Sequence, residues 1–438
     1  MKTILPKGSK KLLNAWAFYD WANSVYNLTI SSAVFPIFWG ALTIVRNDQG
    51  AIVSDTVRFL GYDFNNDSLI SYVTAIAFLT VSIISPLLSG IADYIGNKKN
   101  FLKFFCYLGA LSCIGLYWFS LEHLWFGLLC YFFALIGFWA SLVFYNSYLP
   151  DIAFPEQQDA ISAKGYSLGY IGSVLLLIIN LAMIFFYDSF GFENKGVPTR
   201  LSFVMVGVWW IGFSQYTYYY LPKGHQKDVL SKAVVFNGFK ELKTIWNALK
   251  NDIRLRRYLS AFFVYSMAVQ TIMLIATYFG IEELDWGDQD ATTGLIISIL
   301  LIQLVAVLGA FFTSKASSKF GNIQTLIVIN FIWIGICIYA YTITTPYQFY
   351  ITAAIVGLVM GGIQALSRST YSKLLPKNAV DTASYFSFYD VSEKVGIVIG
   401  MFSYGIIAQM TGSVRYSILF LILFFVIGLI LLFRVPKK

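Results

Sequence analysis

Three charged side chains lie close together in an otherwise apolar stretch, YFSFYDVSEKVGIVIG at residues 385–400: Asp390, Glu393 and Lys394. A charge at the centre of a membrane-spanning helix costs about 2.5–3.5 kcal/mol, so these three must face water or one another. Asp390 and Lys394 have the i,i+4 spacing of an ion pair on one helix face. Glu393 is then the less compensated carboxylate, and we expect it to bind and release a coupling proton. The alternative is a purely structural network that joins this helix to a neighbour.

A second polar face lies near the start of the chain, in AFYDWANSVYN at residues 17–27. Asp20, Asn23 and Asn27 follow i, i+3, i+7 spacing, which gathers them on one side of a helix. Such a stripe could line a cavity and bind substrate, or Asp20 could instead anchor the helix end at the membrane interface. The isolated amides Gln270 and Gln303 are more typical of hydrogen bonds between helices.

Two further apolar stretches carry hydrogen-bonding side chains near one end: Tyr145 and Asn146 in one, Gln364 and Arg368 in the other. Arg368 could hold a substrate carboxylate through two parallel hydrogen bonds, or it could contact lipid phosphate. An arginine and Asp20 in one cavity would suit a zwitterion such as an amino acid.

The composition around these residues is that of an integral membrane protein. Of the 438 residues, 58% are hydrophobic and 12% are charged, about half the charged fraction usual in soluble domains. Both histidines, His123 and His225, lie in loops, so neither a buried Ser–His pair nor a histidine metal site is expected. The sequence also lacks a nucleotide-binding loop. It therefore predicts neither an enzyme nor an ATP-driven pump, and no cofactor or metal.

Apolar runs long enough to cross a ~30 Å hydrocarbon core recur along the whole chain. Most of the 31 lysines and arginines lie at the two ends and in loops on the same side, so both termini are predicted to be cytoplasmic. The formal charge of +8 is thus a signal of orientation rather than of nucleic-acid binding. Windows of about 19 residues predict twelve helices, at 14–44, 68–92, 101–120, 124–149, 160–187, 201–221, 257–281, 291–314, 322–343, 347–373, 380–410 and 414–434.

The long basic loop at 222–256 separates two predicted six-helix bundles, 1–221 and 257–438. Matching Gly-Asn pairs at 96–97 and 321–322, and matching loops at 149–162 and 375–384, have a nearly constant offset, which indicates a duplicated unit. Within the long loop, apolar residues recur at helical spacing. They predict an amphipathic helix lying on an anionic cytoplasmic surface or, alternatively, a solvated linker helix: Phe239, Leu242, Ile245, Trp246 and Leu249.

The stretch GIADYIGNKK resembles the signature of the major facilitator superfamily of transporters, although Tyr94 and Asn97 replace two arginines. The residues in register are Gly90, Asp93, Gly96, Lys98 and Lys99. Four more stretches resemble the vacuole-effluxer, autophagy-related branch of that superfamily and its bacterial relatives: AFYDWANSVYN, FYNSYLPDIA, GGIQALSRSTYSKLLPK and FSFYDVSEKVG. The resemblance implies an all-α polytopic membrane protein, with twelve transmembrane helices in two pseudo-symmetric bundles. It also implies secondary transport, with amino-acid efflux suggested for the fungal relatives.

The same resemblance implies a conformational switch, in which Asp93 meets a helix N-terminus across the boundary between the bundles. We therefore expect a monomeric transporter that moves a small polar solute by alternating access, coupled to protons. Its expected location is the bacterial cytoplasmic (inner) membrane, and its expected partners are the solute and membrane lipids. The alternative is a transport-fold protein that acts as a sensor, a lipid scramblase or a complex subunit.

Overall fold

The computed structural model describes residues 5–47, 52–224, 233–287, 290–376, 379 and 381–436. Within these ranges, twelve helices are long and apolar enough to cross a membrane, which confirms the predicted number. The first span is three joined helices, α1 (Lys10–Val25), the π-helix η1 (Tyr26–Ala33) and α2 (Val34–Thr43). The others are α3 (Asn66–Ile95), α4 (Lys98–Gly115), α5 (Leu124–Asn146), α7 (Pro155–Phe185), α8 (Gly196–Tyr220), α10 (Ile253–Glu283), α11 (Ala291–Phe320), α12 (Asn322–Ala340), α13 (Pro346–Leu374), α14 (Thr382–Thr411) and α15 (Val414–Phe433).

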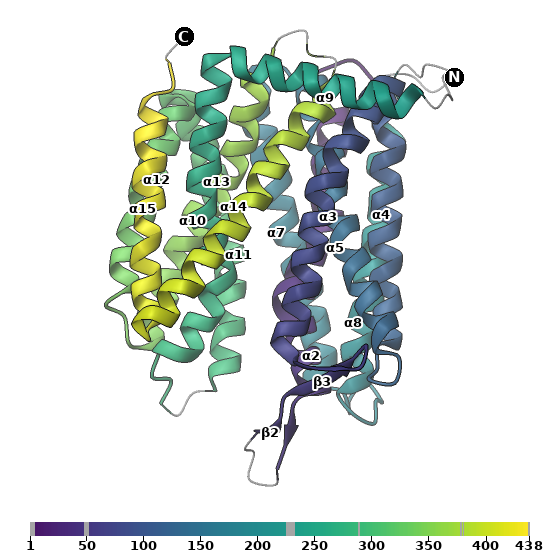
Figure 1. The fold of residues 1–438 in the computed structure, drawn as a ribbon, viewed down its shortest axis with the longest axis vertical. Coiled ribbons are helices and arrows are strands. Elements are labelled where there is room, and N and C mark those ends of the chain that lie inside the picture. The colour runs from purple at the N-terminus through teal and green to yellow at the C-terminus, as the bar shows by residue number, and fades with distance from the viewer. Residues whose placement is uncertain are drawn as a thin grey trace.

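The two ends of the helix bundle differ (Figure 1). At one end, where α1 begins and α15 ends, α9 (Ala233–Asn251) lies across the other helices. At the opposite end, β1 (Val45–Arg46) pairs with β2 (Ile52–Ser54), and β3 (Thr56–Phe59) pairs with β4 (Tyr62–Asn65), both antiparallel. We call these the α9 end and the hairpin end. The remaining short helices are η2 (Leu116–Trp118) and α6 (Leu149–Ile152).

The hairpins were not predicted from the sequence, because strands of two to four residues are too short to stand out in a hydropathy window of about 19 residues. Their one clear mark is the Leu60-Gly61 turn between β3 and β4. Both residues have positive φ, 52° and 87°, which a tight two-residue hairpin turn requires.

Buried apolar side chains form two large clusters. The first contains residues between Leu12 and Leu221 together with Ala383, and the second contains residues between Ile245 and Val435 together with Tyr170. We call helices α1–α8 the first half, helices α10–α15 the second half, and the surface between them the seam. Across the seam, α7 packs against α11 and α13, and α14 packs against α3 and α5.

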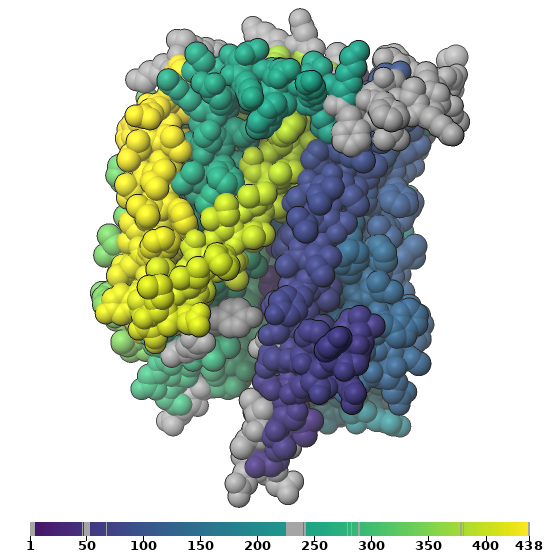
Figure 2. All heavy atoms as spheres, viewed as in Figure 1, coloured from purple at the N-terminus to yellow at the C-terminus, as the bar shows by residue number. Residues whose placement is uncertain are grey.

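The linker helix α9 packs against the other helices of the bundle. Its Ile245 and Leu249 are buried, and it contacts α3 of the first half as well as α10 and α14 of the second. The ring of Trp246 packs against that of Phe388 of α14 at a tilt of 35°, with ring centroids 5.7 Å apart. In Figure 2, α9 covers both the blue α3 and the yellow-green α14. The predicted helix is therefore present, and Ile245 and Leu249 of its apolar face pack against the bundle, whereas Trp246 stays 49% exposed. The side chain of Phe239 lies outside the described part, and contact of this helix with a membrane surface stays a prediction.

Glycines bring α11 and α13 close together within the second half. A Cβ on Gly361 would collide with the backbone of Ala306, and one on Gly309 would collide with the backbone of Leu358. Such small-residue contacts let membrane helices pack through their backbones, where lipid supplies no hydrophobic driving force.

We predict that Gly361→Ala lowers the thermal stability of the purified protein, because its methyl group meets rigid backbone and overpacking costs about 1–3 kcal/mol. The measurement is the midpoint of thermal unfolding in detergent. The matched control is Gly335→Ala on α12, where a Cβ meets no atom within 4 Å and alanine is the better helix former. Equal midpoints for the two variants would contradict the packing argument.

Candidate functional site

A buried ion pair joins the two halves of the protein. Arg368 on α13 and Asp20 on α1 are 1% and 4% exposed, and Nη2 of the arginine donates to Oδ2 of the aspartate at 3.1 Å. The hydroxyl of Tyr145 donates to the same oxygen at 2.8 Å. This burial excludes two sequence-based alternatives, namely that Asp20 anchors a helix end at the interface and that Arg368 contacts lipid phosphate.

The other donors of Arg368 also reach residues of the first half. Nε donates to Oγ of Ser162 at 2.9 Å, Nη2 to the Ser162 carbonyl at 3.0 Å, and Nη1 to Oδ1 of Asn146 at 3.2 Å. The guanidinium carbon lies 4.9 Å from the ring centroid of Trp16 and 4.1 Å from that of Tyr166. The side chain of Arg368 is therefore bound by helices α1, α5 and α7, and these contacts join the two halves across the seam.

Glycine on α7 makes this arrangement possible. A Cβ on Gly165 would collide with Oδ2 of Asp20, and a Cβ on Gly169 would lie 3.1 Å from Cβ of Ser24. The first helix can therefore press its carboxylate directly against the backbone of α7.

The three charges on α14 also pair: the predicted Asp390–Lys394 ion pair is present, and Lys394 binds Glu393 as well. Nζ of Lys394 donates to Oδ1 of Asp390 at 2.7 Å and to Oε2 of Glu393 at 3.0 Å. Nε2 of Gln270 donates to the other oxygen of Glu393 at 2.6 Å. Glu393 is thus bonded at both oxygens, whereas Oδ2 of Asp390 is buried with no hydrogen-bond partner in the part of the chain that the structure describes. The prediction that Glu393 is the less compensated carboxylate is wrong.

One cavity of about 170 Å³ connects these two charged groups. It is lined by most of the predicted site residues: Asp20, Asn23, Asn27, Asn146, Gln364, Arg368, Asp390 and Glu393. Two predicted residues lie behind its wall, because Tyr145 is fully buried where it holds Asp20, and Lys394 is 1% exposed beneath its two carboxylates. The cavity also includes residues that the sequence left aside: Gln270, Gln303, Tyr166, Tyr170, Ser31 and Ser32.

The π-helix η1 explains why Ser31 and Ser32 were missed. The predicted stripe assumed regular α-helical spacing, but eight residues in the middle of the span have the wider π turn. This changes which side chains face the cavity after Asn27, and π segments often occur at functional sites. No sequence signal marks this change of spacing.

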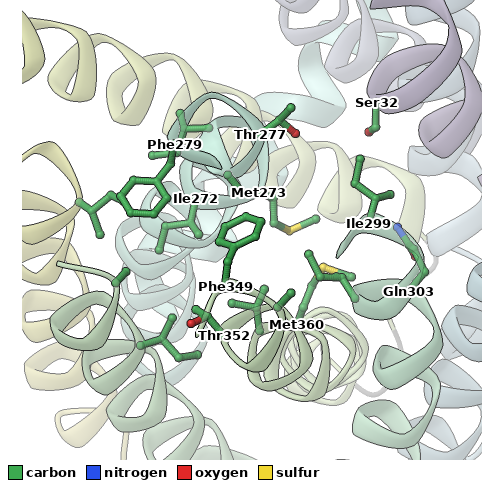
Figure 3. A pocket seen from close by; sticks show the side chains of 18 of the residues that line it. Ser32, Ile272, Met273, Thr277, Phe279, Ile299, Gln303, Phe349, Thr352 and Met360 are labelled. Carbon is green, nitrogen blue, oxygen red and sulfur yellow. The ribbon is translucent and has the colours of Figure 1, made fainter. Parts of the chain in front are cut away.

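An apolar pocket of about 130 Å³ adjoins the polar cavity on the second-half side (Figure 3). Phe279, Phe349 and Ile272 gather on one side of it, and Gln303 and Ser32 lie on the other. The two spaces share lining residues: Asn27, Leu28, Ser32, Met273, Gln303 and Met360. A solute in the polar cavity would therefore have an apolar recess beside it.

The predicted switch residues lie at the α9 end. Asp93, on α3, accepts the backbone N–H of Ser384 at 2.7 Å, the Ser384 hydroxyl at 2.8 Å and the N–H of Ala383 at 3.3 Å, at the start of α14. Lys98 forms an ion pair with Asp151 and donates across the seam to Thr382, and Lys99 donates to the carbonyl of Leu221. Gly96 has a φ of 74° and allows the chain to turn after α3, and Gly90 is buried within that helix.

A second carboxylate of the first half closes the same end at another place along the seam. Asp159, near the start of α7, accepts from Ser317 at 2.8 Å, from Asn322 at 2.9 Å and from Lys373 at 2.6 Å. These partners belong to α11, α12 and α13 of the second half. Sequence reasoning missed Asp159, although it lies in the loop pattern that indicated the duplication. The α9 end is therefore closed by two carboxylates as well as by Arg368.

Twelve spans and a charged cavity between two helical halves define an integral membrane protein with the major facilitator fold. Solved structures agree: the transporter FucP in its outward conformation (TM-score 0.67, 14% identity, 98% of this chain and 99% of that one) and the proton:xylose symporter XylE (TM-score 0.69, 11% identity, 97% and 95%) share the fold. The chain belongs to the vacuole effluxer Atg22-like family, whose model matches residues 8–438.

Curated relatives span nearly the full chain. The uncharacterized MFS-type transporter YxiO of Bacillus subtilis is 32% identical over 428 residues, covering 97% of this chain and 95% of its own. Autophagy-related protein 22 of Kluyveromyces lactis is 24% identical, covering 97% and 93%. These relatives support a role in transport.

We predict that Asp20→Asn and Arg368→Gln each destabilise the protein by about 3–5 kcal/mol, because either change leaves a buried charge unpaired. The double variant should lose less than the sum of the two. The measurement is a double-mutant cycle on thermal unfolding. The control cycle uses Glu283 and Arg415, an ion pair of 2.6 Å within the second half whose side chains are each 17% exposed. Additive losses at Asp20 and Arg368 would contradict direct coupling.

We further predict that Asp93→Asn and Asp159→Asn each open the α9 end more often, because hydrogen bonds to a charged group contribute about 1.5–3 kcal/mol. Spin labels on the exposed residues Glu156 and Lys319, on opposite sides of the seam, should report a larger fraction of long distances by electron resonance. Asp188→Asn, exposed beyond the end of α7, is the control. Unchanged distance distributions in both variants would count against the closing role.

Proposed function

We propose that this protein is a secondary active transporter that moves a small zwitterionic solute, an amino acid, by alternating access coupled to protons. The observation that carries the proposal is the Asp20–Arg368 pair, which lines the cavity and also fastens the seam. A zwitterion offers a carboxylate to Arg368 and an ammonium group to Asp20. Each charge then exchanges one partner for another and is not left alone.

This exchange links binding to movement. In the present state, the guanidinium donates to Asp20, Asn146 and Ser162, all in the first half. A solute that takes over some of these hydrogen bonds weakens the contact between the halves, and a ligand shifts a conformational equilibrium only through such a difference in binding. The adjoining apolar pocket favours an amino acid with an apolar side chain.

The direction of opening follows from the distribution of basic residues. Because most lysines and arginines flank the α9 end, we assign that end to the cytoplasm. The hydrogen bonds and ion pairs of Asp93, Asp159 and Arg368 close this end. The described state is then outward-facing, with the solute entering from the hairpin end, and the membrane is the bacterial cytoplasmic membrane.

Proton coupling is supported by the charges of the site. Three carboxylates, on Asp20, Asp390 and Glu393, share two cations, on Arg368 and Lys394. When all are ionised, one negative charge remains uncompensated inside the membrane, which is costly. A bound proton would neutralise it.

The test is uptake of labelled amino acids into proteoliposomes, grouped by apolar, polar and charged side chains, with and without a pH gradient. We predict gradient-driven accumulation of the apolar group. Arg368→Lys keeps the charge but loses the planar fork. Losing one charged hydrogen bond, about 1.5–3 kcal/mol, should lower apparent affinity about ten- to hundredfold.

Arg415→Lys is the matched control, since Arg415 pairs with Glu283 away from the cavity. Equal flux in the two lysine variants would contradict the assigned role of Arg368. No flux of any amino acid in wild-type protein would favour another solute, or the alternative of a sensor, scramblase or complex subunit.

A further inference from the structure

Oδ2 of Asp390 stands out among the carboxylate oxygens of the cavity. The residue is 6% exposed, it lines the cavity, and no group of the described residues donates a hydrogen bond to this oxygen. By contrast, Asp20 accepts two hydrogen bonds, both at Oδ2, and its Oδ1 is not among the buried atoms that lack a partner; Glu393 accepts one hydrogen bond at each oxygen. A buried acceptor without a donor costs about 1–3 kcal/mol, and more when it is charged.

We propose that Asp390 is the proton-binding site of this protein, and that Glu393 serves to hold Lys394 when the proton is bound. A proton fits this oxygen because it needs a single acceptor and turns the oxygen into a donor. A metal cation needs several oxygen ligands at once, and among the described residues no cluster of carboxylates, histidines or cysteines could supply a metal site.

The geometry of Lys394 allows both protonation states. Its Nζ lies between Oδ1 of Asp390, at 2.7 Å, and Oε2 of Glu393, at 3.0 Å. With Asp390 ionised, the lysine is shared between two carboxylates. With Asp390 protonated, Glu393 alone balances the lysine, and the group of three becomes neutral. Glu393 is held in place for this by Gln270.

The same lysine connects the proton site to the seam. Its Nζ lies 3.7 Å from the ring centroid of Trp139 on α5 of the first half, a cation–π contact across the boundary. Movement of Lys394 toward Glu393 therefore changes a contact between the halves. Proton occupancy and docking of the halves are linked through one side chain.

The electrostatic surroundings of Asp390 are defined on each neighbouring helix. On α3, Asp93 lies farther toward the α9 end, where it binds Ser384. On α5, Trp139 contacts Lys394. Helix α15 contacts α14 near Tyr404, through the hydroxyl of Ser417. The titratable or charged groups that line the cavity around Asp390 are Glu393 and Tyr389 on α14, Asp20 on α1, Tyr166 and Tyr170 on α7, and Arg368 on α13. Lys394 on α14 lies behind its two carboxylates, and Tyr265 on α10 lines a small neighbouring pocket. Of these, Lys394 contacts Asp390 directly.

The inference rests on the proposed function, because a transporter gives the proton its role, but its test needs no solute. Infrared difference spectra of the purified protein in lipid, recorded between about pH 5 and about pH 9, detect the carbonyl band of a protonated carboxyl group. We expect a band that titrates with pH in wild type, is lost in Asp390→Asn, and remains in Glu393→Gln. Loss of the band in Glu393→Gln instead, with Asp390→Asn unchanged, would overturn the proposal.

A second measurement covers the case in which Asp390→Asn does not fold. Dicyclohexylcarbodiimide modifies protonated carboxyl groups in membranes, and peptide mass spectrometry locates the modified residue in wild-type protein. Modification of Asp390 that falls as pH rises, equally in sodium and choline chloride, supports proton binding. Modification of Glu393 instead, or protection of Asp390 by sodium, would overturn it. Both assays give an answer whether or not amino-acid flux is found, so the two proposals fail independently.

Discussion

The requirement that buried charge be compensated inside the membrane governs this structure. Arg368 is almost fully enclosed, and removing one partner of such a pair costs about 3–5 kcal/mol. Its partners therefore cannot separate unless other groups replace them. Those partners all lie on first-half helices. Separating the halves would therefore leave the guanidinium of Arg368 unpaired, and the free energy that this costs stabilises the contact between them. The glycines of α7 leave room for Asp20 in this contact, and the hydroxyl of Tyr145 donates a hydrogen bond to its carboxylate.

The charged residues of α14 also compensate one another, but here two carboxylates share one lysine. Lys394 donates hydrogen bonds to Asp390 and Glu393, and among the described residues nothing donates to Oδ2 of Asp390. Arg368 and the α14 group face one cavity but act on the seam through different helices, the first through α1, α5 and α7, the second through Trp139 of α5. The proposed solute and the proposed proton would thus bias the same movement from separate places, which is what coupling between two sites requires.

The sequence predicted the features that depend on hydropathy and spacing. Twelve long apolar runs set the number of spans, and i,i+4 spacing predicted the Asp390–Lys394 pair. Apart from the contact of Asp93 with a helix N-terminus, which the family resemblance implied, it did not predict the partners that distant segments supply. Glu393 has its second partner, Gln270, on another helix, and Asp159 meets three other helices. The amphipathic pattern of α9 was detected, but such a pattern does not distinguish a protein surface from a membrane surface. The π-helix η1 left no mark, because its hydrogen-bond spacing is a property of the packed helix.

The carboxylate contacts across the seam have a direction, although other hydrogen bonds, such as those from Lys98 to Thr382 and from Tyr170 to Gln364, run the opposite way. The carboxylates of Asp20, Asp93 and Asp159 belong to the first half, and the groups that donate to them from across the seam belong to the second: Arg368, Ala383, Ser384, Ser317, Asn322 and Lys373. Two copies of the first half would bring acceptor against acceptor, and two copies of the second would bring cation against cation, which disfavours both pairings. In terms of assembly, the two halves of the single chain resemble the subunits of an obligate heterodimer. The placement of carboxylates on one half and donors on the other favours pairing of unlike halves.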